Sequence, residues 1–311
     1  MTMIVCVTMN PALDKTAALT RLVPGALNRL RHVRVDAGGK GVNVSGMAAV
    51  LGGASVCTGF VGGETGRELL RRLEARGLAH DFLTVAGATR TNLKVLDGEN
   101  RLTELNEPGP GVTDAEVAAL LEKTHALARR GDVVVLSGSL PPGAGVDTYR
   151  LFAGTLRAAG CRVIVDADGE PFRRALEAPP HVVKPNRFEL LQYGGLPSDT
   201  PNECLPALCR SLLGKGIEWV VLSMGRDGAM FFTGQRAVWA TAPPVEAHSA
   251  VGAGDSMVGA IACALQTGFG FEETVRLAMA ASLGAVTTQG TQPPALALVN
   301  KWKAQIEMRP V

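Results

Sequence analysis

The stretch Asp132-Val-Val-Val-Leu-Ser137 decides the fold class of this chain. Its run of apolar residues between two polar ends predicts a strand that is buried on both faces, as the strands of parallel sheets are. The flanking stretches 114–129 and 148–159 have the apolar spacing of helices that cover a core. A buried strand between two such helices is the repeating unit of an α/β fold with a parallel sheet.

The same alternation recurs outward from this stretch in both directions. We predict further strands at 4–9, 54–60, 162–166, 181–183, 217–223 and 229–233. We predict further helices at 41–51, 64–75, 170–177, 186–192, 203–213, 254–266 and 272–287. The pattern favours a three-layer α/β/α arrangement with a mostly parallel central sheet, and because no linker interrupts it we expect a single domain over residues 1–311.

Two segments, 14–36 and 89–107, break the alternation because they are rich in β-branched and charged residues but lack helical periodicity. Each is expected to form a small antiparallel excursion. Ligands of open α/β sheets bind at the carboxyl ends of the parallel strands. We therefore expect the two segments together to form a β lid over that edge.

Composition excludes several classes of function. The 311 residues are 46% hydrophobic, which supports a large core, and the net charge of +2 gives no reason to invoke nucleic acid or an anionic membrane surface. No apolar run reaches the ~18 residues that cross a bilayer, and Met1–Val7 does not resemble a signal peptide. The six cysteines are scattered without a CxxC pair, so we expect free thiols in the cytoplasm and no zinc site.

The sharpest motif is Ser249-Ala-Val-Gly-Ala-Gly-Asp255-Ser-Met-Val-Gly259, which places glycines just before an apolar helix. The unpaired N–H groups and the dipole at such a helix start attract an anion, here at Gly252, Ala253 and Gly254. Asp255 has two interpretations. It can cap the helix, or it can accept the proton of a substrate hydroxyl while the N–H groups hold a phosphoryl group.

A second glycine cluster, Asp36-Ala-Gly-Gly-Lys-Gly-Val-Asn43, also precedes a predicted helix. It is either a plain tight turn or a binding loop, in which backbone N–H groups, Lys40 and Asn43 hold a polar anionic substrate. Neither glycine cluster is a Walker loop or a dinucleotide-binding fingerprint, because the required spacings are missing.

Three weaker signals accompany these clusters. In Lys184-Pro-Asn186-Arg-Phe-Glu189 an amide and a carboxylate lie three residues apart, which suits water-mediated Mg²⁺ binding but also ordinary helix capping. Arg90, Asn92 and Lys94 alternate at strand period and share one face, which is either solvated or grips a phosphate. Ser137-Gly-Ser139 ends the buried strand, where either a ligand-contacting loop or a plain turn is expected.

Taken in this order, the motifs resemble those of the ribokinase-like carbohydrate kinases of the PfkB family. The resemblance extends from Thr8-Met-Asn-Pro-Ala-Leu-Asp14 to Gln289-Gly-Thr291. Its most specific part reads Ala250-Val-Gly-Ala-Gly-Asp255-Ser256, with Ala250 where the family has a hydroxyl residue. That departure precedes the glycines, so we expect no loss of catalysis. The resemblance implies a ribokinase-like fold that uses ATP and Mg²⁺.

The resemblance also implies roles for individual residues. Asp255 would be the catalytic base, with the anion hole at Gly252, Ala253 and Gly254. The residues expected to bind ATP are Lys184, Asn186, Ser223, Gly225, Gly228 and Ser282. Those expected to bind Mg²⁺ through water are Asn186 and Glu189. Those expected to contact the sugar phosphate are Asp14, Arg29, Gly38, Gly39, Lys40, Asn43, Arg90, Asn92, Lys94 and Ser139.

Within the family, the stretches 27–29, 38–43, 89–94 and 105–110 look most like the phosphosugar branch that converts fructose 1-phosphate to fructose 1,6-bisphosphate. Minor-type 6-phosphofructokinases usually lack a lysine at the position of Lys40. Phosphorylation of tagatose 6-phosphate or fructose 6-phosphate is the alternative, and a nucleoside or vitamin kinase, or a non-catalytic nucleotide-binding protein, is a more distant one. Lid segments of relatives often pair between subunits, which implies a homodimer.

Overall fold

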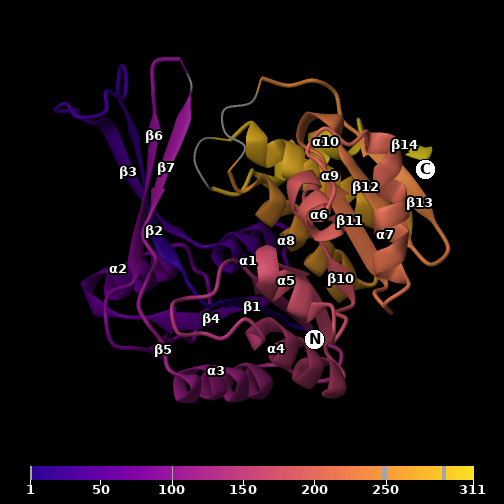
Figure 1. Ribbon diagram of the computed structural model, residues 1–311, viewed down its shortest axis with the longest axis horizontal. Coiled ribbons are helices and arrows are strands. Elements are labelled where there is room, and N and C mark those ends of the chain that lie inside the picture. Colours follow the sequence, from indigo (N-terminus) through magenta and orange to yellow (C-terminus); the bar gives the residue numbers. More distant parts are fainter. Residues whose placement is uncertain (1, 100, 247–250, 289–291) are drawn as a thin grey trace.

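The computed structural model describes residues 2–99, 101–246, 251–288 and 292–311. Its described strands form two sheets (Figure 1). The large sheet has ten strands in the order β14-β13-β12-β11-β10-β9-β8-β1-β4-β5, and the small sheet has four in the order β3-β2-β6-β7. The mixed α/β class predicted from the sequence is confirmed.

The strands of the large sheet are β1 (Ile4–Thr8), β4 (Ser55–Val61), β5 (Leu83–Thr84), β8 (Val133–Ser137), β9 (Arg162–Asp166), β10 (Val182–Val183), β11 (Trp219–Ser223), β12 (Ala229–Thr233), β13 (Ala237–Thr241) and β14 (Glu307–Pro310). Those of the small sheet are β2 (Ala12–Ala18), β3 (Arg31–Gly38), β6 (Arg90–Leu96) and β7 (Leu102–Asn106). The helices are α1 (Lys40–Val50), α2 (Gly63–Ala75), α3 (Asp114–Leu127), α4 (Thr148–Ala158), α5 (Gly169–Ala175), α6 (Arg187–Gly194), α7 (Leu205–Leu213), α8 (Ala253–Thr267), α9 (Phe271–Val286) and α10 (Leu296–Lys303), with 3₁₀ turns η1 (Asn202–Cys204) and η2 (Gly225–Asp227).

The large sheet is parallel from β5 to β11 and antiparallel beyond. Cys6 of β1 lies beside Cys57 of β4 and Val135 of β8, in parallel register on both sides. Strands β12, β13 and β14 then pair antiparallel. The sequence reading missed β13 and β14. β14 is an exposed edge strand that contains Pro310, a residue that edges tolerate, and it carries no continuous apolar run.

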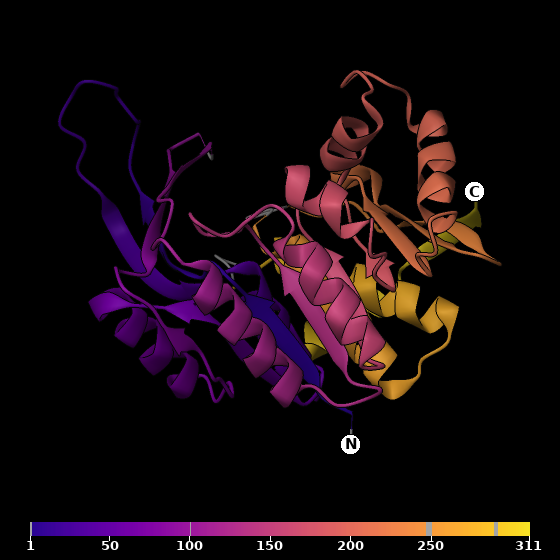
Figure 2. The same ribbon diagram turned by 60° about the horizontal axis from the view of Figure 1, so that its bottom comes forward.

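Successive residues of the central strands feed two separate cores. In β1, Ile4 and Cys6 pack with α1, α8 and α9, whereas Val5 and Val7 pack with the helices on the other face. This alternation is what strand geometry requires of a sheet that is covered on both sides. Figure 2 shows the magenta helices α3 and α4 lying in front of the strands, with the yellow helices behind them.

The small sheet begins near the carboxyl end of β1, because β2 starts shortly after β1 ends. The pairs β2–β3 and β6–β7 are antiparallel, as predicted for the two irregular segments. A parallel pairing of β2 with β6 joins them into one sheet. In Figure 1 this sheet rises from the body of the molecule beside the carboxyl ends of the parallel strands. Within the described residues, no helix has the length and apolar character to span a membrane.

Candidate active site

The candidate site lies where several parallel strands end and two helices begin. β1, β8, β9 and β11 end in Thr8, Ser137, Asp166 and Ser223. Because these strands are parallel, their carboxyl ends meet at one edge of the sheet, the place where open α/β sheets bind ligands. Helices α1 and α8 start at this edge and pack against each other.

Asp255 is the third residue of α8 and is buried. The residue that caps the helix is Gly252, whose φ of 83° is in the left-handed region that favours glycine, and it makes no side-chain cap. Asp255 instead accepts a hydrogen bond of 2.8 Å at Oδ2 from Nδ2 of Asn43. The capping interpretation of Asp255 is therefore wrong, and its carboxylate is held beside the positive end of α8.

Burial raises the pKa of Asp255, and the nearby Asp166 raises it further. The ammonium groups of Lys40 and Lys184 and the hydrogen bond from Asn43 act in the opposite direction, but the net pKa remains above the ordinary value. A carboxylate with a raised pKa is a stronger base, which suits a group that must accept a proton near neutral pH.

Asp166 joins two lysines at this edge. Its Oδ1 lies 3.3 Å from Nζ of Lys40 and 3.3 Å from Nζ of Lys184. Burial alone would lower the pKa of Lys40, yet Asp166, Asp255 and Glu189 together raise it, so the ammonium group stays charged. The site therefore contains two fixed cations next to the start of α8.

A second buried cluster lies on the face of the small sheet that carries Asp14. Lys94 Nζ contacts Asp14 Oδ2 at 2.8 Å, and Asn92 Nδ2 donates to Asp14 Oδ1 at 3.1 Å. A Cβ on Gly38 would lie 2.5 Å from Cγ of Asp14, so only glycine leaves room for this carboxylate. Lys94 is thus engaged with a carboxylate inside the protein.

Arg90 connects the small sheet to two loops. Its Nε and Nη2 donate to the backbone oxygen of Asn10 at 3.2 and 2.9 Å, and its Nη1 donates to that of Glu107 at 3.3 Å. Asn10 in turn donates to Oγ of Ser139 at 3.4 Å. Arg90, Asn92, Lys94 and Ser139 therefore lie around the same edge.

Asn186 and Glu189 form the capping box of α6, the ordinary explanation that the sequence left open. Glu189 N donates to Asn186 Oδ1 at 2.9 Å, and Asn186 N donates to Glu189 Oε2 at 2.8 Å. Burial raises the pKa of Glu189, although Lys184 and Lys40 oppose this. The box leaves Oε1 of Glu189 free of hydrogen bonds within the described residues, which fits a water of a hydrated Mg²⁺. The described residues contain no cluster of metal-ligating side chains.

The turn after β11 lies against Asn186, since Asn186 and Ser223 form an isolated parallel bridge. Gly225 has φ 60° and Gly228 has φ 87°. A Cβ on Gly228 would lie 2.1 Å from the backbone oxygen of Ala240, so this turn requires glycine for space as well as for conformation.

Comparison with known proteins identifies the family to which this chain is similar. Residues 5–297 match the model of the pfkB family carbohydrate kinases. The chain belongs to this family. It is therefore an ATP-dependent sugar kinase, and its fold is the ribokinase-like one that the sequence predicted.

Several individual relatives resemble the chain over nearly its whole length. The 1-phosphofructokinase of Xanthomonas campestris pv. campestris is 38% identical, over 95% of this chain and 97% of the relative. That of Rhodobacter capsulatus is 39% identical, over 94% and 92%. Among solved structures, phosphofructokinase-2 from Escherichia coli in complex with potassium matches with a TM-score of 0.92 and 30% identity, over 98% of this chain and 99% of that one.

Two predicted residues lie away from the site residues at the strand ends. Arg29 lies in the exposed connection between β2 and β3. Ser282 lies half-buried on α9, without a hydrogen bond to the cluster. Gly39, by contrast, lies against Thr8: it has φ 112°, and a Cβ there would lie 2.7 Å from Cγ2 of Thr8. Ser249 and Ala250 fall outside the described residues.

Sequence reasoning missed three buried polar side chains at the strand ends. Thr8 Oγ1, Ser137 Oγ and Asp166 Oδ2 have no hydrogen-bond partner among the described residues. Buried polar atoms are nearly always paired in native proteins, so orphans gathered at one edge indicate a place for a ligand or water. The available signal was their position, a polar residue directly after a buried apolar strand.

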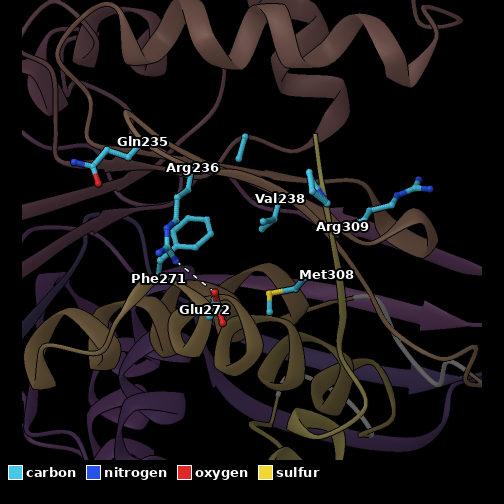
Figure 3. Close-up of a pocket in the computed structure, with 9 residues that line it drawn as sticks. Gln235, Arg236, Val238, Phe271, Glu272, Met308 and Arg309 are labelled. Carbon is cyan, nitrogen blue, oxygen red and sulfur yellow. Dashed lines mark hydrogen bonds and ion pairs between the residues drawn. The ribbon is translucent and has the colours of Figure 1, made fainter.

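A surface hollow lies elsewhere, between β13, β14 and the start of α9 (Figure 3). It has a volume of about 480 Å³ and is lined by Gln235, Arg236, Ala237, Val238, Phe271, Glu272, Met308, Arg309 and Pro310. Arg236 and Glu272 form an ion pair of 3.4 Å across it. It contains none of the predicted site residues, so the chemistry is assigned to the strand-end cluster instead.

Proposed function

We propose that this kinase transfers the γ-phosphoryl group of ATP to fructose 1-phosphate and releases fructose 1,6-bisphosphate. The observation that carries the reaction is the buried carboxylate of Asp255, fixed by Asn43 at the start of α8 and faced by two lysines. The choice of sugar is supported by the relatives that are 38% and 39% identical and are named 1-phosphofructokinase.

In this proposal Asp255 accepts the proton of the attacking sugar hydroxyl. The backbone N–H groups at Gly252, Ala253 and Gly254, with the positive end of α8, stabilise the charge on the phosphoryl group as it moves. Lys184 supports the same charge, because its ammonium nitrogen lies 3.3 Å from where a Cβ on Gly254 would be. Positioning and electrostatics then supply most of the catalysis.

The sugar phosphate lies between the strand ends and the small sheet. Asp14 accepts hydrogen bonds from its hydroxyls, and Asn43 donates to them. Gly38 and Gly39 allow the sugar to approach closely. Asn92 and Ser139 lie at the border of the sugar site. Arg90 binds its existing phosphate, whereas Lys40, which acts electrostatically on Asp255, lies on the side of the phosphoryl group that is transferred. Lys94 acts as the counter-charge of Asp14 rather than as a phosphate ligand.

ATP occupies the other side of the same edge. Its phosphates approach Lys184 and Asn186, and its nucleoside lies along Ser223, Gly225 and Gly228 towards Ser282. Asn186 and Oε1 of Glu189 would hold Mg²⁺ through water beside these phosphates, and the ion would supply positive charge to the transferred group.

We further propose that two copies pair through the small sheet, which acts as a lid. Exposed apolar side chains gather there, at Val23, Leu27, Leu30, Val33, Leu102 and Leu105. A hollow of about 500 Å³ lies on the sheet face, lined by Lys15, Leu30, Thr91, Leu93, Leu105, Asn106 and Glu107. Exposed apolar patches of this kind mark protein interfaces. In such a pair Arg29, which is exposed in one copy, lies close enough to its partner's site to meet the substrate phosphate.

The dimer is tested by light scattering on Leu105→Glu. Leu105 is 56% exposed on β7, and we expect this variant to be monomeric where the unmodified chain is dimeric. Leu151→Glu is the matched control, because Leu151 is 51% exposed on α4 and should leave the dimer intact. A monomeric unmodified chain would contradict the proposal.

The reaction is tested by coupled ADP release with ATP and Mg²⁺ against fructose 1-phosphate, fructose 6-phosphate, tagatose 6-phosphate, ribose and adenosine. The highest kcat/KM is expected for fructose 1-phosphate. Turnover of ribose or adenosine alone would overturn the phosphosugar assignment.

A second candidate is phosphorylation of fructose 6-phosphate. It is favoured by the structural likeness to phosphofructokinase-2 from Escherichia coli in complex with fructose-6-phosphate, with a TM-score of 0.89 and 29% identity. The lower identity places it second. A preference for fructose 6-phosphate or tagatose 6-phosphate in the same assay would keep the mechanism and change the sugar.

A further inference from the structure

Asp166 holds two lysines that come from different parts of the chain. Its carboxylate ends β9, is only 1% exposed and contacts Nζ of Lys40 and Nζ of Lys184 through the same oxygen, each at 3.3 Å. The two ammonium nitrogens therefore lie no further apart than twice this distance.

Two ammonium groups so close repel each other unless a carboxylate lies between them. Burial alone would raise the pKa of Asp166, but Lys184 and Lys40 more than offset this and keep it ionised. The lysines differ in freedom: the Lys184 side chain is 5% exposed and cannot turn to solvent, whereas that of Lys40 is 34% exposed and can. Without the charge of Asp166, Lys40 is the group expected to move.

The lysines border the start of α8 in different ways. Lys184 lies against Gly254, at 3.3 Å from where a Cβ would be. Lys40 begins α1, and its side-chain stem passes near Gly138 at the end of β8. Both ammonium groups act electrostatically on Asp255. Asp166 forms no hydrogen bond with Asp255, so its influence passes through the lysines as well as through space.

We propose that Asp166 is a positioning residue that fixes the ammonium groups of Lys40 and Lys184 on either side of the phosphoryl group during transfer. The inference rests on the proposed function, because it requires a phosphoryl group that crosses between Gly254 and the sugar. Charges fixed in advance need no reorganisation at the moment of reaction, which makes their position matter more for kcat than for binding.

The test variant is Asp166→Asn, which keeps the shape of the side chain and removes its charge. With whichever sugar phosphate the unmodified chain turns over, we expect kcat to fall about 10²-fold, while KM for ATP and for the sugar changes far less. In a Lys40→Met background the same substitution should cost much less, because residues that act through one another are not additive. Asp166→Glu, which keeps the charge, should recover part of kcat.

Asp132→Asn is the matched control. Asp132 is also buried, and it accepts hydrogen bonds from the backbone N–H groups of Met3 and Arg129 near the start of β8. We expect its substitution to lower thermal stability and leave kcat unchanged. An equal fall of kcat in this control, or an equal cost of Asp166→Asn with and without Lys40, would overturn the proposal.

A measurement without turnover separates this inference from the proposed reaction. Acetic anhydride labelling followed by mass spectrometry should show faster acetylation of Lys40 in Asp166→Asn than in the unmodified chain, with the exposed Lys215 unchanged. Unchanged labelling of Lys40 would overturn the positioning role. If the unmodified chain phosphorylates no sugar phosphate, the proposed function fails, and the labelling still decides whether Asp166 holds the lysine.

Discussion

Asn43 and Asp255 are 212 positions apart in the chain, yet Nδ2 of Asn43 donates a 2.8 Å hydrogen bond to Oδ2 of Asp255. The bond joins the beginnings of α1 and α8, two helices that pack against each other on one face of the sheet. It fixes the direction in which the carboxylate points. The remaining oxygen, Oδ1, is the one available to a substrate hydroxyl.

Replacing Asp255 with Asn should abolish most of the turnover. Asn keeps the shape and the neighbour Asn43 but cannot accept a proton, so we expect kcat to fall about 10²- to 10⁴-fold with little change in either KM. The coupled ADP-release assay measures this, and a thermal melt confirms that the variant is folded. Turnover close to that of the unmodified enzyme would remove Asp255 from the role of base.

Replacing Asn43 with Ala should shift the pH dependence. The hydrogen bond from Asn43 lowers the pKa of Asp255, so its loss raises that pKa further above the ordinary value. Because the base acts in its deprotonated form, the acid limb of the kcat/KM profile is expected to move to higher pH. A profile that moves to lower pH, or not at all, would show that the bond does not stabilise the ionised form.

Gly38→Ala should affect substrate binding through Asp14. The added Cβ would lie 2.5 Å from Cγ of Asp14, so the carboxylate must move away from its place beside Lys94 and Asn92. We expect a higher KM for the sugar and an unchanged KM for ATP in steady-state assays. Gly52→Ala is a control for backbone strain alone, because Gly52 has φ 78° and open space around it. Equal effects of the two substitutions on the sugar KM would contradict the steric argument.

The parts of the fold that the sequence predicted are those in which local pattern and tertiary environment agree. Val133–Ser137 is apolar and is buried on both faces, and the Gly-Ala-Gly-Asp255 motif starts a helix. The edge strand β14 was missed because its four residues are mostly exposed and carry no pattern of burial. The parallel pairing of β2 with β6 was also missed, because strand partners that are far apart in sequence leave no local trace.

The sequence predicted those site residues that stand in a recognisable motif. It missed those whose role depends only on their neighbours in three dimensions. Asp255 and Asn43 stand in glycine-rich motifs, whereas Asp166 simply ends a strand. Its role depends on two lysines 126 and 18 positions away, and no spacing rule connects them. Arg29 shows the opposite case, a residue picked from the sequence that this single chain leaves in solvent.

The cysteines should behave as inert groups with one exception. Cys204 is exposed, and the other five are buried. Burial raises the pKa of Cys57 to about 11 and those of Cys209 and Cys263 to about 12, so little thiolate exists near neutral pH. Titration of the native enzyme with an aromatic disulfide reagent should modify Cys204 rapidly and the others only after unfolding. Fast reaction of more than one thiol in the native enzyme would contradict this. So would an unfolded Cys204→Ser variant in which no thiol reacts.

Substitution of Arg90 should weaken the binding of the sugar phosphate without affecting that of ATP. Its guanidinium bridges the backbone oxygens of Asn10 and Glu107, which fixes its plane beside Asp14 on the sugar side of the site. Loss of a charge-assisted hydrogen bond costs about 1.5–3 kcal/mol, so Arg90→Ala should raise the KM for the sugar phosphate at least about tenfold and leave that for ATP unchanged. Arg67→Ala, an exposed α2 residue paired with Glu64, is the control and should change neither. An unchanged sugar KM in Arg90→Ala would show that the existing phosphate of the substrate is bound elsewhere.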